Sequence, residues 1–188
     1  MKINIVAAGK IKEKYLTAGI NEFLKRLTPF AQVKIIEISE EKMKDNPSEA
    51  EKLQTLTAEG ERLLKQVPEG SYLIVLDVYG KELSSEALAE HINKLGIKGQ
   101  SNITFLIGGA FGLSEELRSR ADLRLSFSQM TFSRMNFGCD RSTCAVRAKL
   151  ALRQLDKARF RLENSALNEP FGLMDLAVEY TEQGRYRR

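Results

Sequence analysis

Asn102-Ile-Thr-Phe-Leu-Ile-Gly-Gly-Ala-Phe-Gly-Leu113 is a short apolar, β-rich run that ends in glycines. This composition is typical of a buried strand whose C-terminal end meets a ligand. Gly108 and Gly109 remove side chains where a flat ligand or a neighbouring backbone comes close. A second strand-like run, Leu125-Ser-Phe-Ser-Gln-Met-Thr-Phe132, ends in small polar residues, as a loop that binds through its backbone does. An ordinary βα turn and an edge strand explain the two runs equally well.

Strands and helices alternate on both sides of this stretch. The patterns predict strands over residues 2–7, 31–38, 72–77, 103–107 and 123–127, and helices over 13–30, 49–67, 84–94 and 114–120. Gly60 is a weak point of the helix over 49–67. The alternation predicts an α/β fold, with a mostly parallel sheet and helices on both faces. Ligands of such sheets lie outside the carboxyl ends of the strands, which here indicates the ends near Leu76, Gly108 and residues 128–132.

Composition excludes several classes of protein. The 188 residues support one domain with a real core and contain no apolar run long enough for a transmembrane helix. The N-terminus leads into an amphipathic stretch instead of a cleavage site, so we expect no signal peptide. Cys139 and Cys144 are the only cysteines, which fits neither a disulfide framework nor a zinc site. We therefore expect a cytoplasmic protein without a metal ion.

Phosphate-binding motifs are incomplete. Both Gly-Lys pairs lack the upstream glycine of a phosphate loop, because Asn4 and Val75 occupy those positions. A dinucleotide fingerprint would need a second glycine where Ala110 stands. NAD and ATP are thereby disfavoured, and adenosyl ligands without phosphates remain.

Several motifs resemble the ribosomal RNA large subunit methyltransferase H family, without a gap over residues 1–132. They are Lys2-Ile-x-Ile, Gly9-Lys-Ile-Lys-Glu-Lys-Tyr-Leu16, Glu22-Phe-Leu-Lys-Arg-Leu27, Phe105-Leu-Ile-Gly-Gly-Ala-Phe-Gly-Leu113 and Leu125-Ser-Phe-Ser-Gln-Met-Thr-Phe132. The resemblance implies a SPOUT-class (α/β-knot) fold, a homodimer and a C-terminal trefoil knot.

The resemblance also implies a function. The family transfers a methyl group from S-adenosyl-L-methionine to N3 of a pseudouridine in 23S rRNA of the large subunit, on the assembled ribosome. The residues that it implies for donor binding are Leu76, Gly108, Phe127, Ser128, Gln129, Met130, Thr131 and Phe132. These positions coincide with the three strand ends that the sheet rule indicates. No catalytic residue is assigned; His91, the only histidine, is predicted to be a solvated helix residue.

The chain departs from the family after Phe132. The family continues with Pro-His-Gln and ends in Pro-Tyr-His-Lys, whereas this chain continues Ser133-Arg-Met-Asn-Phe-Gly-Cys139 and ends Gln183-Gly-Arg-Tyr-Arg-Arg188. Residues 133–188 hold two lysines and nine arginines, and they supply the whole net charge of +4. We therefore divide the chain into a SPOUT-like domain, 1–132, and a divergent, Arg-rich helical tail, 133–188. A shifted reading frame or a gene rearrangement is our hypothesis for the origin of the tail.

The tail bears on function. An apolar stripe through Ala148, Leu152 and Leu155 predicts a basic amphipathic helix, which either contacts rRNA phosphates or packs on the sheet. In the family this segment completes the knot, the donor pocket and the dimer face. Two alternatives to an active methyltransferase therefore stay open, a non-catalytic rRNA- or ribosome-binding protein and an inactive product of a frameshifted or rearranged gene.

Overall fold

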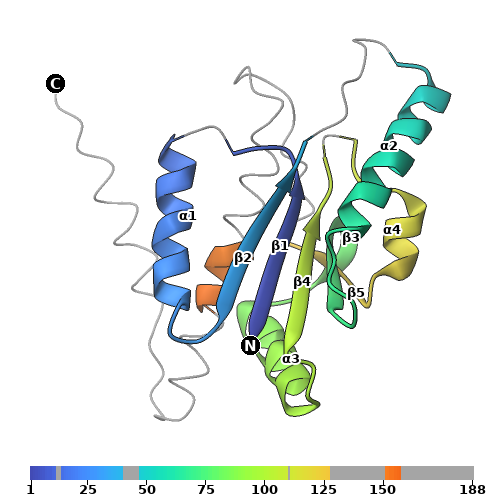
Figure 1. The fold of residues 1–188 in the computed structure, drawn as a ribbon. Helices are drawn as coiled ribbons and strands as arrows, with labels where there is room; N and C mark the ends of the chain where they lie inside the picture. The colour runs from blue at the N-terminus through green and yellow to red at the C-terminus, as the bar shows by residue number, and fades with distance from the viewer. Residues whose placement is uncertain (12–13, 40–46, 110, 128–150, 158–188) are drawn as a thin grey trace, which may run out of the picture.

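A computed structural model describes residues 1–11, 14–39, 47–109, 111–127 and 151–157. Within these ranges strands and helices alternate (Figure 1). The strands are β1 (Lys2–Ala8), β2 (Gln32–Ile38), β3 (Tyr72–Glu82), β4 (Asn102–Ile107) and β5 (Leu123–Ser126). The helices are α1 (Lys14–Leu27), α2 (Glu49–Leu64), α3 (Ser85–Ile97) and α4 (Glu115–Arg120). The predicted α/β architecture is confirmed.

The five strands form one parallel sheet in the order β2-β1-β4-β3-β5. β1 lies between β2 and β4, with Ile5 opposite Ile35 on one side and Phe105 on the other. Asn4 Nδ2 donates to Asn102 Oδ1 across the β1–β4 pair, at 3.0 Å. β3 lies between β4 and β5. The two motif loops follow β4 and β5, so they begin on either side of β3.

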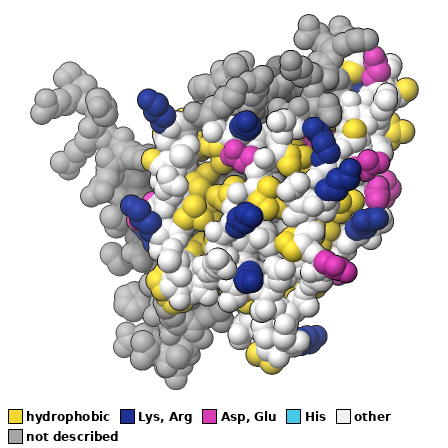
Figure 2. Space-filling view, in the orientation of Figure 1, with side chains coloured by type: hydrophobic (Ala, Val, Ile, Leu, Met, Phe, Trp, Pro, Cys, Tyr) yellow, Lys and Arg dark blue, Asp and Glu magenta, His cyan; other side chains and the backbone are white. Residues whose placement is uncertain are grey.

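Two apolar layers cover the two faces of the sheet. One layer joins α1 and α3 to side chains such as Ile5, Ile74 and Phe105. The other joins α2 and α4 to Val6, Val75 and Leu106, which alternate with the first set along the same strands. Figure 2, in the orientation of Figure 1, shows hydrophobic side chains near the middle of the molecule with Lys and Arg among them. Helices therefore lie on both faces, as the sequence predicts.

The helices begin where their capping residues stand. Ser48, Ser84 and Ser114 are the N-caps of α2, α3 and α4, and each side-chain oxygen accepts from a backbone N–H of the first turn. In α2 the cap is a reciprocal capping box with Glu51. No helix in the described ranges is both long and apolar enough to cross a membrane.

A short helical segment, residues 151–157, is the described part of the predicted amphipathic helix. Ala151, Leu152 and Leu155 are buried in the layer that contains α1 and α3. Ser85 Oγ donates to Gln154 Oε1 at 2.6 Å. This segment packs on the sheet; most of the basic residues that flank the predicted stripe lie outside the described residues.

Candidate functional site

The carboxyl ends of β4, β3 and β5 are neighbours along the sheet. The connection after β3 leads to α3 on one face, and the connection after β4 leads to α4 on the other. Adjacent parallel strands whose connections leave toward opposite faces open a crevice between their ends, and ligands of open α/β sheets bind there. The topology thus predicts a ligand-binding crevice between the ends of β3 and β4.

β3 does not end where its apolar run ends. Leu76 pairs with Leu125 of β5, the next four residues leave the ladder, and Lys81 then pairs with the same Leu125. A Cβ on Gly80 would lie 2.7 Å from the carbonyl carbon and oxygen of Arg124, so only glycine fits this close return. The predicted strand over 72–77 is therefore too short, because the chain rejoins β5 through Glu82.

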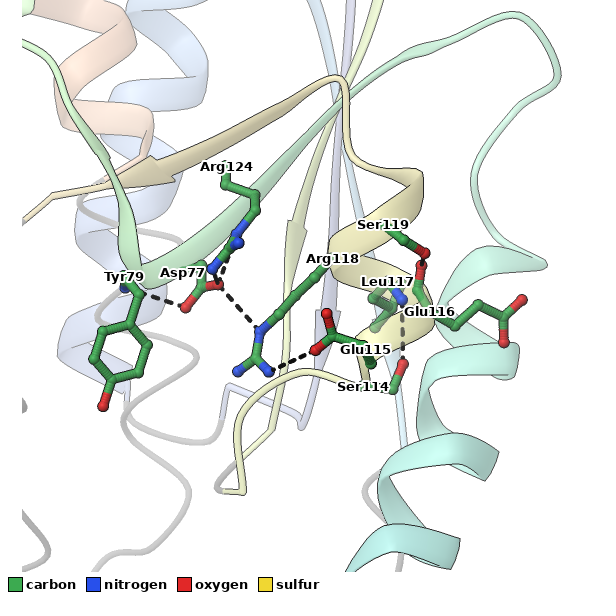
Figure 3. Close-up of polar contacts among 9 residues, drawn as sticks. All are labelled: Asp77, Tyr79, Ser114, Glu115, Glu116, Leu117, Arg118, Ser119 and Arg124. Atoms are coloured by element: carbon green, nitrogen blue, oxygen red, sulfur yellow. Dashed lines mark hydrogen bonds and ion pairs between the residues drawn. The ribbon is translucent and has the colours of Figure 1, made fainter.

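Asp77 stabilises this bulge of β3, formed by the four residues between Leu76 and Lys81. Its side chain is 5% exposed, and Oδ1 accepts from Tyr79 N at 3.2 Å (Figure 3). Oδ2 accepts from Arg124 Nη2 at 2.7 Å, Arg124 Nε at 3.1 Å and Arg118 Nε at 3.2 Å. A single carboxylate thus ties the bulge of β3 to α4 and to β5.

Burial acts to raise the pKa of Asp77. The hydrogen bonds from Tyr79 and Arg124 and the charges of Arg118 and Arg124 outweigh burial, so the pKa of this carboxyl lies below its ordinary value. Glu115 accepts from the other side of Arg118, at 3.4 Å, and is itself mostly exposed (Figure 3). Asp77 is therefore an ionised structural carboxylate that fixes two arginine side chains beside the site.

The loop after β4 is folded tightly on itself. Gly112 N donates to Gly109 O at 3.2 Å, and Gly112 has a φ of 94°, in the left-handed region. A Cβ on Gly108 would lie 2.3 Å from the carbonyl oxygen of Gly112. Gly108 is thus required by the loop's own backbone, the second of the two roles that the sequence leaves open for it.

α2 holds this loop from the other side. Glu59, which is 7% exposed, accepts from Gly109 N through Oε1 at 2.9 Å. The adjacent Gly60 lies against Ser114, whose Oγ would be 2.5 Å from a Cβ at that position. Gly60 therefore makes room for α4 and is not merely a weak point of its helix.

The structure brings together those predicted donor-binding residues that it describes. Leu76 is buried at the end of β3, Gly108 directly follows β4, and Phe127 directly follows β5 and is partly buried against the core. Ser128, Gln129, Met130, Thr131 and Phe132 lie outside the described residues.

The sequence indicates Asp77 only as part of the strand end Leu76-Asp77-Val78, and it does not indicate Glu59, Arg118 or Arg124. A signal existed for Asp77, an acidic residue directly after an apolar strand, and for Glu59, which precedes a glycine inside a helix. No local pattern indicates the two arginines, because their roles depend on a carboxylate more than 40 residues away.

His91 is not the solvated residue that the sequence predicts. Its ring is partly buried, Nε2 lies 3.2 Å from the hydroxyl of Tyr72, and the two rings are in contact. Burial and the charges of Lys81, Lys94 and Lys98 lower the pKa of His91, which favours its neutral form. No group of three metal-binding side chains occurs in the described part of the chain.

Comparison with known proteins identifies the family. The family model described as "Predicted SPOUT methyltransferase" matches residues 1–136. A ribosomal RNA large subunit methyltransferase H from Halothermothrix orenii is 56% identical over 133 residues, which cover 71% of this chain and 84% of that protein. The protein of the same name from Alkaliphilus oremlandii is 52% identical over 132 residues, 70% and 83% of the two chains.

One solved structure, a probable methylase family protein from Haemophilus influenzae, is 15% identical, with a TM-score of 0.45 over 96% of this chain and 77% of that one. The family assignment depends on the sequence matches, which span more than two thirds of both chains. The chain belongs to the ribosomal RNA large subunit methyltransferase H family of SPOUT methyltransferases.

Proposed function

We propose that this protein transfers a methyl group from S-adenosyl-L-methionine to N3 of a pseudouridine in large-subunit rRNA. The observation that carries the proposal is its family membership, through relatives named for the methylation of this RNA. The crevice that the topology predicts supports it, because the positions that the resemblance implies for donor binding lie at or after the ends of β3, β4 and β5, which are neighbours in the sheet.

The donor would be held by Leu76, Gly108 and residues 127–132. The described residues suit an adenosyl ligand in kind, since Leu76 and Phe127 are apolar, as the walls of an adenine pocket are. Gly109 and Gly112, which bond to each other after β4, bring backbone groups to the same edge of the sheet. The ordered surroundings of Asp77 keep the end of β3 in place, which pre-organises the site.

S-adenosyl-L-methionine supplies an electrophilic methyl group on a sulfonium sulfur, and its departure needs no acid. The imide N3–H of the pseudouridine must lose its proton as the nitrogen accepts the methyl group. The protein's part is therefore to align the nitrogen with the methyl group and to place a base or a water molecule at N3.

Two measurements test the function. Calorimetric titration of the full chain with S-adenosylmethionine should show saturable binding, and the absence of binding would remove the enzyme hypothesis. Mass spectrometry of large-subunit rRNA, from cells that carry only this gene copy, should then show the methylated pseudouridine. Binding without methylation would favour a non-catalytic ribosome-binding protein.

We further infer a cytoplasmic homodimer that acts on the assembled ribosome and has the knot of its family. These features are carried over from the family, in which the segment that follows the position of Phe132 completes the knot and the dimer face. Light scattering coupled to size exclusion should give twice the 21.2 kDa chain mass, and the mass of a monomer would contradict the dimer.

A further inference from the structure

We propose that Glu59 of α2 is a positioning residue for the loop after β4, of which residues 108, 109 and 111–113 are described, and through this loop for donor binding. The inference rests on the proposed function. It concerns a buried carboxylate that contacts the candidate site from behind, on a different element from the donor-binding positions.

The contact between Glu59 and the loop is direct and close. Oε1 accepts from Gly109 N at 2.9 Å, and both atoms are buried. A Cβ on Gly109 would lie 2.8 Å from each carboxylate oxygen and 3.1 Å from Cδ. The carboxylate therefore lies against the Cα of Gly109 as well as bonding its N–H.

The φ of Gly109 does not require a glycine. It is not among the glycines with a positive φ, whereas Gly112 in the same loop is. The carboxylate of Glu59 is thus the obstacle to a side chain at Gly109. Gly109 and Glu59 form a matched pair, in which one residue leaves the space that the other fills.

α2 also fixes the far end of the loop. Gly60, next to Glu59, packs against Ser114, and Ser114 Oγ accepts from Leu117 N to begin α4. Two consecutive residues of one helix therefore set the positions of Gly109 and Ser114. The loop that follows Gly108 is held at both ends by a rigid element.

Loss of the carboxylate would leave a buried N–H without its acceptor. A buried donor without a partner is costly, and a loop can relieve that cost by moving toward water. Such a movement would displace Gly108 from the crevice. We therefore expect changes at Glu59 to weaken donor binding even though Glu59 does not touch the donor.

The test compares Glu59→Gln with Glu59→Leu by calorimetric titration with S-adenosylmethionine. Glutamine keeps an oxygen acceptor at similar volume, so its dissociation constant should stay within about twofold of wild type. Leucine fills the space without an acceptor, so the constant should rise about tenfold or more. Glu61→Leu, at an exposed position of the same helix, should leave it unchanged.

A double-mutant cycle tests the pairing. Gly109→Ala pushes the carboxylate away, so it should weaken binding by a factor similar to that of Glu59→Leu. Both changes break the same interaction. The dissociation constant of the double variant should therefore exceed that of the weaker-binding single variant by no more than about threefold. If the fold-changes of the two single variants multiply in the double variant, the pairing of Glu59 with Gly109 would be overturned.

Leu95→Ala distinguishes a general loss of stability from a specific loss of donor binding. Leu95 is buried in α3, and the neighbouring Gly96 lies beside Met1, at the opposite edge of the sheet from the crevice. This variant should unfold more easily in urea and keep its donor affinity.

Three further results would count against the inference. Equal binding by wild type and Glu59→Leu, with both folded, would overturn the inference alone. A loss in Glu59→Gln as large as in Glu59→Leu would overturn the acceptor role. No binding by wild type would overturn the proposed function together with the inference.

Discussion

Asp77 shows how one residue can join three elements near a site. It accepts from four N–H groups, one of Tyr79, one of Arg118 and two of Arg124, while almost wholly buried. The two arginines stay partly exposed, at 28% and 40%, so water still solvates their remaining N–H groups. The desolvation cost therefore falls mainly on the carboxylate, which is fully bonded.

Asp77→Asn should lower the free energy of unfolding at pH 7 by about 1–3 kcal/mol, because asparagine lacks the charge that the arginines bond. The pKa of Asp77 is lowered in the folded state. Its stabilisation is thus fully present above the ordinary pKa of about 4, and it is lost as the pH falls through the folded-state pKa.

Urea denaturation of wild type and Asp77→Asn between pH 7 and pH 3 measures this difference. The gap between the two proteins should shrink as the pH falls below about 4. A difference in the free energy of unfolding that does not vary with pH would contradict the lowered pKa of Asp77. Glu115→Gln, an exposed partner of Arg118, should change stability by less than about 0.5 kcal/mol.

At the scale of elements, α2 and α3 offer a matched pair of helical glycines. Gly60 in α2 faces Ser114 and Leu117, whereas for Gly96 in α3 the one atom near the Cβ position among the described residues is Met1 Cε, at 3.5 Å. The same substitution therefore meets a crowded site in one helix and an open site in the other.

Gly96→Ala should raise the free energy of unfolding by up to about 1 kcal/mol through helix propensity. Gly60→Ala should lower it by about 1–3 kcal/mol, because the methyl group would collide with Ser114 Oγ, which caps α4. Thermal melts of both variants check this contrast. A stabilised Gly60→Ala would show that α2 and α4 do not pack as closely as described.

The sequence predicts most elements because their signals are local. The serine caps, the apolar run at Tyr72 and the β-branched strands determine their positions without help from distant residues. The return of β3 to β5 was missed, because its cause is the backbone of Arg124, 44 residues after Gly80. The bond between Glu59 and Gly109 was missed for the same reason, since it joins residues 50 positions apart.

At the scale of the whole molecule, residues 151–157 belong to the core although they lie after residues 1–136, which the family model matches. Leu152 is completely buried, and its layer includes Ile5, Ile74 and Phe105 from three strands. Asp156 also lies 3.7 Å from Arg26 of α1. This segment thus supports the sheet directly.

Leu152→Ala should lower the free energy of unfolding by about 2–5 kcal/mol, as expected for a cavity in a packed core. Lys157→Ala, at an exposed position of the same segment, should change it by less than about 0.5 kcal/mol. Chemical denaturation of both variants gives the two values. Equal, small effects would mean that the segment does not pack on the sheet.

The strand order also has a consequence for synthesis on the ribosome. β1 can pair with β2 as soon as both have emerged, but its other edge must wait for β4, whose residues follow those of β1 by 100 positions. At about 5–20 residues per second, that edge stays open for roughly 5–20 s. An unpaired parallel edge is a template for pairing with another chain. The nascent protein is therefore most exposed to aggregation in the interval between the emergence of β2 and that of Asn102, whose side chain bonds Asn4.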